Sequence, residues 1–388
     1  MSGILRRFFL PVVCPSAVIS VMQQALLVVL PLYVLEIGGS LADSAMIIAL
    51  KGVGMMAADL PAGALLARIG DKRLMIGSVA LFIAALILMA LVPSLPVLML
   101  AAVLLGLAYG AWLVARISFI SDAAEVHERG RVMALSAGTI RLGNVIGPAM
   151  AGLLIAAMGY GVTLYIFAAS MLLVILFIHL WVQNHPSSTH QARHVTGLKA
   201  TLRDNQKTFL TAGIAAFALT LVRSSRALLL PLAGAALLLD EASIGLAISA
   251  GAIIDALLFY PAGSMMDRIG RKPIFIASLV ILGAAIALLP LSQGFVGLVA
   301  IASLMGIGNG ISAGVIMTMG SDLAPQHNKG SFIGVWRLLS DVGATAGPLL
   351  ISTIVKLSGL AMAAHSIGII GLIGGAYALK AVRETNKQ

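Results

Sequence analysis

The sequence is poor in charged residues. Charged side chains make up 10% of its 388 residues, and hydrophobic residues make up 60%. Soluble domains contain about 25% charged residues. A soluble protein with the present composition would expose a large apolar surface to water, so the composition excludes an ordinary globular protein and predicts an integral membrane protein. The apolar segments are long and do not alternate with polar residues, which favours membrane helices over a β-barrel.

Cysteine and acidic residues are also scarce. The single cysteine, Cys14, excludes an intramolecular disulfide, and no spacing of ligand residues indicates a metal site, so we expect no metal and no cofactor. The net charge is +10. In a soluble protein this charge would suggest nucleic-acid binding. Here the basic residues lie between apolar runs, as membrane orientation requires. No nucleophile–base pair or phosphate-binding loop is visible, so an enzyme is not expected.

About 20 mainly apolar residues are enough to cross a bilayer as a helix. The sequence contains twelve such segments, at 10–35, 44–67, 74–93, 95–120, 131–157, 160–182, 208–236, 243–266, 273–292, 294–320, 331–356 and 360–380. The long polar segment between the sixth and seventh contains three histidines, for which we favour a solvated linker over a metal site. We therefore predict an N-terminal six-helix bundle at 1–182, a cytoplasmic linker at 183–207 and a C-terminal six-helix bundle at 208–388.

Lysine and arginine concentrate in the connections on one side of the predicted membrane, including the N-terminal Arg6 and Arg7 and the linker. Cytoplasmic loops carry such an excess, so both termini and the linker are expected in the cytoplasm. The N-terminal stretch resembles a signal peptide, but it lacks a convincing cleavage site and is interpreted as the first membrane helix. The expected location is the bacterial cytoplasmic (inner) membrane.

Several short sequences recur at a constant offset of 200 residues. The pairs are LPL at 30–32 and 230–232, PAGALLARIGDKRLM at 61–75 and PAGSMMDRIGRKPIF at 261–275, SDAAEVHERG at 121–130 and SDLAPQHNKG at 321–330, and GNVIGP at 143–148 and GATAGP at 343–348. A constant offset over most of each half predicts two bundles of the same fold. Such parallel repeats are related by an axis along the membrane normal in two-domain transporters.

One repeated stretch resembles the loop motif of the major facilitator superfamily, Gly-x-x-x-Asp-Arg-x-Gly-Arg-Arg/Lys. Its residues here are Gly263, Asp267, Arg268, Gly270, Arg271 and Lys272. The first copy departs from the motif, because Ala67 replaces the aspartate and Asp71 replaces an arginine. With the repeat, the helix count and the central linker, the resemblance covers the whole chain. It implies an all-α membrane protein with twelve transmembrane helices in two pseudosymmetric six-helix bundles, working as a transporter by alternating access.

The chemistry of this motif suggests a gating latch on the cytoplasmic side. Asp267 is expected near the N-terminus of a neighbouring helix, where an anion is favourable. The basic residues are expected to pair with Asp122 and Asp322 and to separate when that side opens. Plain cytoplasmic positive charge would explain the arginines and the lysine, but not the glycines or Asp267. The degraded first copy predicts a latch that is stronger in the second half.

A second resemblance is to the antiporter motif of the same superfamily. It lies in the fifth predicted helix at Gly143, Gly147 and Pro148, and it recurs in the eleventh at Gly343, Gly347 and Pro348. Glycines four residues apart allow two helices to approach closely, and the proline bends the helix. Among relatives this motif implies proton-coupled export, while ordinary helix packing is the alternative. The fourth-helix Arg-x-x-Gln-Gly motif is not visible, which counts against a drug exporter.

Nine ionisable residues lie inside the predicted helices, where such residues usually mark function. They are Lys51, Asp59, Arg116, Arg141, Arg223, Arg226, Asp255, Arg337 and Asp341. The positive excess suggests a central cavity that binds an anion, lined by Gln23, Gln24, Arg141, Arg223, Arg226 and Arg337. The candidate proton carriers are Asp341, Asp255 and Asp59. In the alternative, Arg337 pairs with Asp341, Arg141 pairs with another acid, and no net field remains.

The sequence therefore predicts a monomeric secondary transporter in a lipid bilayer. The favoured activity is proton-coupled export of a small organic solute, such as an anionic metabolite or a siderophore. Proton-coupled import of an organic anion and multidrug efflux stay open as alternatives. An alternative of another class is a non-transporting membrane sensor or scaffold.

Overall fold

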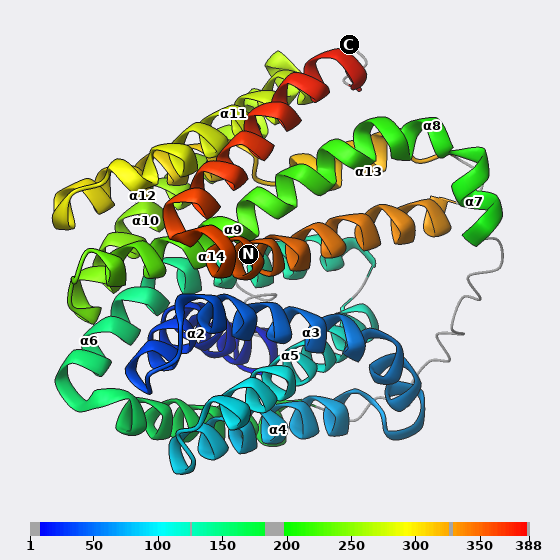
Figure 1. Cartoon of the computed structure of the whole chain (residues 1–388). Helices are drawn as coiled ribbons and strands as arrows, with labels where there is room; N and C mark the ends of the chain where they lie inside the picture. The colour runs from blue at the N-terminus through cyan, green and yellow to red at the C-terminus, as the bar shows by residue number, and fades with distance from the viewer. Residues whose placement is uncertain (1–7, 125, 183–197, 326–328, 386–388) are drawn as a thin grey trace. The chain divides into compact units, whose positions relative to one another are not determined.

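The structure is a computed structural model that describes residues 8–124, 126–182, 198–325 and 329–385. Residues 183–197 of the predicted linker lie outside the described part. Throughout the described ranges the chain forms helices and short connections, with no strand (Figure 1). A chain in lipid has to satisfy its backbone polar groups internally, and helices do so within each segment. The all-α class predicted from composition is confirmed.

The chain divides into two compact units. Unit 1 contains residues 1–193 with 240–246, and unit 2 contains residues 194–239 with 247–388. The precise limits predicted for the two bundles and the linker stay a prediction. The helices of unit 1 are η1 (Phe9–Val13), α2 (Cys14–Glu36), α3 (Leu41–Ile69), α4 (Asp71–Leu91), α5 (Leu95–Ala123) and α6 (Val126–Trp181). Within unit 1, α2 lies along α6, α3 along α5, and α4 along both α5 and α6.

Unit 2 repeats the order of the long helices. Its helices are α7 (Leu198–Asp204), α8 (Gln206–Thr208), η2 (Phe209–Gly213), α9 (Ile214–Ala236), α10 (Glu241–Ile269), α11 (Arg271–Leu288), η3 (Leu289–Leu291), α12 (Gly294–Ile311), α13 (Val315–Leu323) and α14 (Lys329–Ala381). In this order α12 and α13 stand in the place of the single α5, and there are additional short helices. The first residues of α10 belong to unit 1. Within unit 2, α14 lies along α9 and α11, and α11 lies along α12.

Among the described residues, ten helices are long and apolar enough to cross a membrane. Two of these, Leu135–Trp181 and Gly330–Ala381, have 47 and 52 residues. Each is about 70 Å or more in length and exceeds twice the ~30 Å core of a bilayer. Each is also interrupted by a glycine with positive φ, Gly159 (76°) and Gly359 (84°), a conformation that glycine adopts without steric cost. The helices thus provide twelve crossings, as predicted.

The 200-residue offset seen in the sequence extends to local backbone features. The two π-helical turns, η1 and η2, begin at Phe9 and Phe209. Prolines inside helices come in three pairs with the same offset: Pro31 and Pro231, Pro61 and Pro261, and Pro148 and Pro348. Proline removes one backbone donor and bends a helix. The two halves therefore carry helix-bending residues at corresponding positions.

Many large apolar side chains lie on the outside of the units. On the second part of α6, for example, Leu172, Leu173, Leu176 and Leu180 are all exposed. Exposed leucine at this density would be a liability in water. It is the expected surface for contact with lipid, where helix association does not depend on burying apolar side chains from water.

Candidate functional site

The middle of unit 2 contains a chain of three polar side chains from three helices. Arg223 Nε in α9 donates a hydrogen bond to Asn309 Oδ1 in α12 over 2.7 Å. Asn309 Nδ2 donates in turn to Asp255 Oδ2 in α10, also over 2.7 Å. Asp255 has no exposed surface, Asn309 is buried and Arg223 is half-buried. The chain thus leads from a partly accessible cation to a completely buried acid.

These three residues lie near the centre of their membrane spans. Position 255 is equidistant from the two ends of α10, Glu241 and Ile269, so about 21 Å of helix lies on either side of Asp255. Arg223 and Asn309 are near the centres of the spans Gln206–Ala236 and Gly294–Leu323. An ionisable group at this depth is costly unless it has a partner or lines an aqueous cavity, and it usually serves a function.

Glycines bring α10 and α12 close enough for this contact. A Cβ atom on Gly310 would lie 2.9 Å from the Asp255 carbonyl oxygen and 2.8 Å from Leu258 Cβ. Gly251 and Gly306 face each other in the same way and leave no room for a side chain. Sequence reasoning did not select Asn309, because a neutral residue among glycines carries no charge signal. Its place 54 residues after Asp255 became informative only through this helix contact.

The other predicted site residues of unit 2 are Arg226, Arg337 and Asp341. Arg226 is half-buried and follows Arg223 by three positions, so the two share a face of α9. Arg337 Nε lies 3.6 Å from Asp341 Oδ2, four residues later on α14, and 57% of the Arg337 side chain is exposed. The contact matches the alternative in which Arg337 is paired. It makes Arg337 a weaker candidate for the anion site than Arg223.

Unit 1 contains Gln23, Gln24, Arg141 and Asp59. Gln23 in α2 is 5% exposed, and its Nε2 has no hydrogen-bond partner among the described residues. Gln24 and Arg141 are half-buried. Asp59 belongs to α3, but its side chain is outside the described part of the structure. Gln23 is thus a buried amide with hydrogen-bonding capacity to spare, whereas a cavity shared with the arginines of unit 2 stays a prediction.

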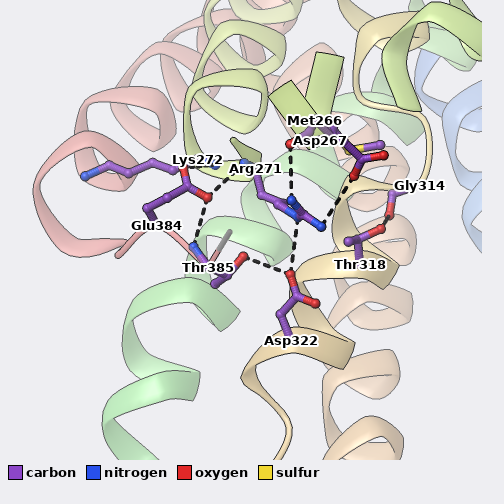
Figure 2. A network of polar contacts seen from close by, with 9 residues as sticks. All are labelled: Met266, Asp267, Arg271, Lys272, Gly314, Thr318, Asp322, Glu384 and Thr385. Carbon is purple, nitrogen blue, oxygen red and sulfur yellow. Dashed lines mark hydrogen bonds and ion pairs between the residues drawn. The ribbon is translucent and has the colours of Figure 1, made fainter. Parts of the chain in front are cut away.

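Three of the predicted latch residues of the second half, Asp267, Arg271 and Asp322, form a polar network at one end of unit 2 (Figure 2). Arg271 Nε lies 3.3 Å from Asp322 Oδ2 at the end of α13, and Arg271 NH2 lies 3.5 Å from Asp267 Oδ1. Arg271 NH1 also donates to the Met266 carbonyl oxygen over 3.3 Å. The structure therefore brings Arg271 to one of its expected partners, Asp322. Whether this network gates transport stays a prediction.

The acid at the N-terminus of α11 is Glu384, while Asp267 lies in the last turn of α10 with its side chain 75% exposed. Glu384 Oε1 accepts from the Arg271 backbone N–H over 2.9 Å, and Oε2 accepts from the Lys272 N–H over 3.1 Å. The first turn of α11 has no acid of its own, and Gly270 before it has no side chain to cap it. Glu384 supplies the anion that a helix N-terminus favours.

The remaining motif residues complete this description. Arg268 is exposed, Gly263 has open space around the position of a Cβ, and Gly270 adopts a φ of 105° at the turn between α10 and α11. In unit 1, Asp122 is half-buried near the end of α5, and Lys72 Nζ donates to the His179 carbonyl oxygen over 2.8 Å. Asp71, which occupies the position equivalent to Arg271 in the first copy of the repeat, is buried at the start of α4. The two halves therefore make different contacts at their equivalent turns.

The glycines of the antiporter-like motif make close helix contacts inside each unit. A Cβ on Gly143 would lie 2.6 Å from the Ser20 carbonyl, and one on Gly147 would lie 2.6 Å from the Val21 carbonyl oxygen, both in α2. Gly343 and Gly347 approach Phe217 and Leu221 of α9 in the corresponding way, at 2.6 and 2.7 Å. Pro148 and Pro348 are buried inside α6 and α14. The motif thus provides the crossing of the first and fifth helices of each half.

Comparison with known proteins identifies the family. The model of the Major Facilitator Superfamily matches residues 13–222 and 212–388, which together cover nearly the whole chain. The chain belongs to the major facilitator superfamily. It is 31% identical over 115 residues to the inner membrane transport protein YajR of Escherichia coli (strain K12), and 31% identical over 169 residues to the uncharacterized MFS-type transporter Rv2456c of Mycobacterium tuberculosis (strain ATCC 25618 / H37Rv). These matches cover 29% and 42% of this chain, and 25% and 40% of the relatives.

Solved structures support the same fold over the full length. A POT family transporter in complex with a thioalcohol-conjugated peptide has a TM-score of 0.78, with 98% of this chain and 97% of that chain covered. Another, in complex with 5-aminolevulinic acid, has a TM-score of 0.75 with the same coverage. Both are 13% identical to this chain, so the likeness concerns the fold. Family and fold together make this protein a multi-pass membrane protein of the major facilitator superfamily.

Proposed function

We propose that this major facilitator transporter is proton-coupled and moves a small organic anion. The observation that carries the proposal is the hydrogen-bonded chain from Arg223 through Asn309 to Asp255 at mid-span in unit 2. A guanidinium offers a rigid fork of donors that matches a carboxylate, sulfonate or phosphate. The carboxyl group of Asp255, in the same hydrogen-bonded series, can take up and release a proton. Binding of solute and of proton then occur within one set of contacts.

The sign of the coupling follows from charge. A proton on Asp255 removes a negative charge from the surroundings of Arg223, so it raises the affinity of the site for an anion. Linkage is reciprocal, so a bound anion raises the proton affinity of Asp255 by the same factor. The two ions therefore bind together, which is the requirement for symport. With an inward proton gradient, symport imports the anion.

Proton-coupled export is the second candidate. It is favoured by the glycine–proline motif at Gly143, Gly147 and Pro148, which in relatives implies exchange of a solute for protons. Exchange requires the proton and the solute to exclude each other. Export of an anion by that route requires protonation of the site to weaken anion binding. The contacts between Asp255, Asn309 and Arg223 support the opposite effect, in which protonation strengthens anion binding. Direction therefore discriminates between the two candidates.

Transport in proteoliposomes tests the proposal. Radiolabelled benzenesulfonate and citrate serve as anionic probes and tetraethylammonium as a cationic one. Benzenesulfonate and tetraethylammonium keep their charge at every pH, and citrate adds a carboxylate probe whose charge falls in acid. With the outside acidic, we expect anion accumulation inside the vesicles and no gradient-driven movement of the cation. Accumulation driven by an acidic interior would establish exchange instead. Movement of the cation alone would overturn the anion proposal.

A matched pair of variants locates the site. Arg223→Gln removes the positive charge from the hydrogen-bonded series Arg223–Asn309–Asp255. It is expected to lower anion flux at least about tenfold, the effect of losing one charge-assisted pair. Lys356→Gln removes an exposed cation of α14 and should leave the flux unchanged. Equal flux in the two variants would remove Arg223 from the solute site.

A further inference from the structure

An apolar cavity of about 190 Å³ lies at the end of unit 2 where α9 and α11 end. It is lined by the last turn of α9, by η3 and by the part of α14 that directly follows Gly359. Ala233 in its wall follows Arg223 by ten positions of α9, which is about 15 Å along the helix axis. The cavity is therefore separate from the proposed solute site, and its role does not depend on the function proposed above.

The repeat shows what fills the same place in unit 1. The positions 200 residues before Ala233 and Leu360, which both line the cavity, hold Tyr33 and Tyr160. The two tyrosine rings stack with their centroids 5.0 Å apart and their planes 10° from parallel, and both side chains are buried. Alanine and leucine supply no ring. The cavity of unit 2 thus lies where unit 1 has two stacked phenol rings.

A second pair of positions removes further side-chain volume from unit 2. Leu164 is completely buried in unit 1, and its equivalent in the wall of the cavity is Ala364. Glu36 is likewise replaced by Ala236. An empty space in a packed structure costs stability, because the atoms around it lose their contacts. Unit 1 forms the same fold with this place filled, so the fold does not require the cavity.

Ser292 provides the cavity with one hydrogen-bonding side chain. In unit 1 the Tyr33 hydroxyl donates to the Met89 carbonyl oxygen over 3.3 Å. In unit 2 the equivalent carbonyl oxygen, that of Leu289, accepts from Ser292 Oγ over 2.7 Å. A hydroxyl that donates its hydrogen can still accept through its oxygen. Ser292 Oγ is therefore an acceptor for a hydroxyl group that enters the cavity.

We propose that this cavity binds a small, uncharged phenol. An apolar cavity of about 150 Å³ stays dry and takes up benzene, so the present one has room for a substituted ring. The ring occupies the place that Tyr33 and Tyr160 fill in unit 1, and its hydroxyl donates to Ser292 Oγ. None of the described residues that line the cavity is charged. A charged ligand would lose its hydration there without gaining a partner, which excludes phenolates and carboxylates.

A lipid acyl chain is the competing occupant. Leu291, between two residues of the wall, is 70% exposed, and Ala236 and Ala361 are exposed as well. The cavity can thus be reached from outside the unit. Two observations favour the phenol over the chain. The equivalent space in unit 1 is filled by flat rings, and an acyl chain has no donor for Ser292.

Photolabelling of the full chain in lipid nanodiscs tests the proposal. The probe is a phenol that carries a diazirine, and mass spectrometry locates its adducts. We expect adducts in 233–237, 289–292 and 360–364, and their loss when excess 4-fluorophenol is present. The methyl ether 4-fluoroanisole cannot donate a hydrogen bond and should compete more weakly. Equal competition by phenol and ether would overturn the phenol class.

A filled cavity provides the decisive variant. Ala233→Tyr with Leu360→Tyr restores the residues of unit 1 and should abolish labelling of the wall. Leu357→Tyr is the matched control, because Leu357 is 78% exposed and lies outside the wall, and it should retain labelling. If the double variant does not fold, Ala364→Leu fills the same space with the residue of unit 1.

Three results would contradict the phenol site. Labelling of the wall that persists in a folded, filled variant would show that the probe reacts from outside the cavity. Adducts spread equally over lipid-facing leucines such as Leu172 and Leu176 would show partition into the bilayer only. Adducts from a phospholipid with a photoreactive acyl chain, located in the wall and not displaced by 4-fluorophenol, would identify lipid as the occupant.

Discussion

Glu384, near the end of the chain, accepts hydrogen bonds from the backbone N–H groups of Arg271 and Lys272 at the start of α11. The next residue, Thr385, donates through its hydroxyl to Asp322 Oδ2 over 3.1 Å, and Asp322 is also the partner of Arg271 (Figure 2). The segment after α14 is thus tied to both α11 and α13. A helix that begins with two basic residues is expected to be especially sensitive to losing this acid, because its own dipole is positive there.

Replacing Glu384 with glutamine should therefore weaken the start of α11. The expected loss is about 1 kcal/mol in the free energy of unfolding, the usual contribution of a helix cap. Thermal unfolding of the purified chain in lipid measures it. Glu36→Gln, a change at the end of α2, is the matched control and should leave the unfolding temperature unaltered. A Glu384→Gln variant as stable as wild type would show that the cap contributes nothing.

The pair Arg271–Asp322 should be coupled but weak. Asp322 is 29% exposed, and partly exposed pairs contribute about 0.2–1 kcal/mol. A double-mutant cycle with Arg271→Ala and Asp322→Ala gives the coupling energy. If the pair serves as a latch, both single variants should also increase labelling of cysteines introduced at the cytoplasmic ends of the helices. Unchanged labelling would contradict the gating interpretation and show that the Arg271–Asp322 pair is only a structural contact.

The close crossing of α9 and α14 predicts a sharp contrast between two glycines of the same helix. A Cβ on Gly347 would lie 2.6 Å from both Ser224 Oγ and Ser225 Oγ, whereas one on Gly334 meets nothing within 4 Å. Gly347→Ala should cost about 1–3 kcal/mol through overpacking. Gly334→Ala should be neutral or slightly stabilising, because alanine favours helix. Yield and unfolding temperature measure both, and equal values would contradict the crossing.

The two arginines of unit 2 that face different partners should behave differently in transport. Arg337 is largely exposed and paired with Asp341 on its own helix, while Arg223 is half-buried and held by Asn309. Arg337→Gln is expected to change anion flux less than about twofold, the scale of a weak exposed ion pair. Arg223→Gln should change it about tenfold or more. Flux assays on both variants under one pH gradient make the comparison, and the reverse order would move the site to α14.

Much of the architecture could be predicted from the sequence because its signals are periodic and redundant. Long apolar runs predicted the membrane helices, and the offset of 200 residues predicted that Pro31, Pro61 and Pro148 would have equivalents in the second half. Glu384 could not be found in this way. It lies 113 residues from Arg271, and nothing local shows that the end of the chain returns to the start of α11.

The candidate site was only partly visible in the sequence for a physical reason. Charge inside an apolar run marks a residue whatever its partners are, so Arg223 and Asp255 were found. Asn309 carries no charge, and its role depends on an approach of α10 to α12 that three glycines allow. Similarly, whether Arg337 pairs with Asp341 depends on the rotamers of the two side chains, and their spacing in the sequence does not determine these. Partners of this kind require coordinates.

Proton movement accompanying the solute tests the central claim most directly. Benzenesulfonate is added outside lightly buffered proteoliposomes with no imposed gradient, and the external pH is recorded. Because anion and proton are proposed to enter together, the medium should become more alkaline on addition of the anion. This response should vanish in Asp255→Asn. It should persist in Ser278→Ala, a matched control that removes a buried hydroxyl donating to the Gly308 carbonyl oxygen, next to Asn309. Acidification of the medium, or anion entry with no change in external pH, would contradict the account.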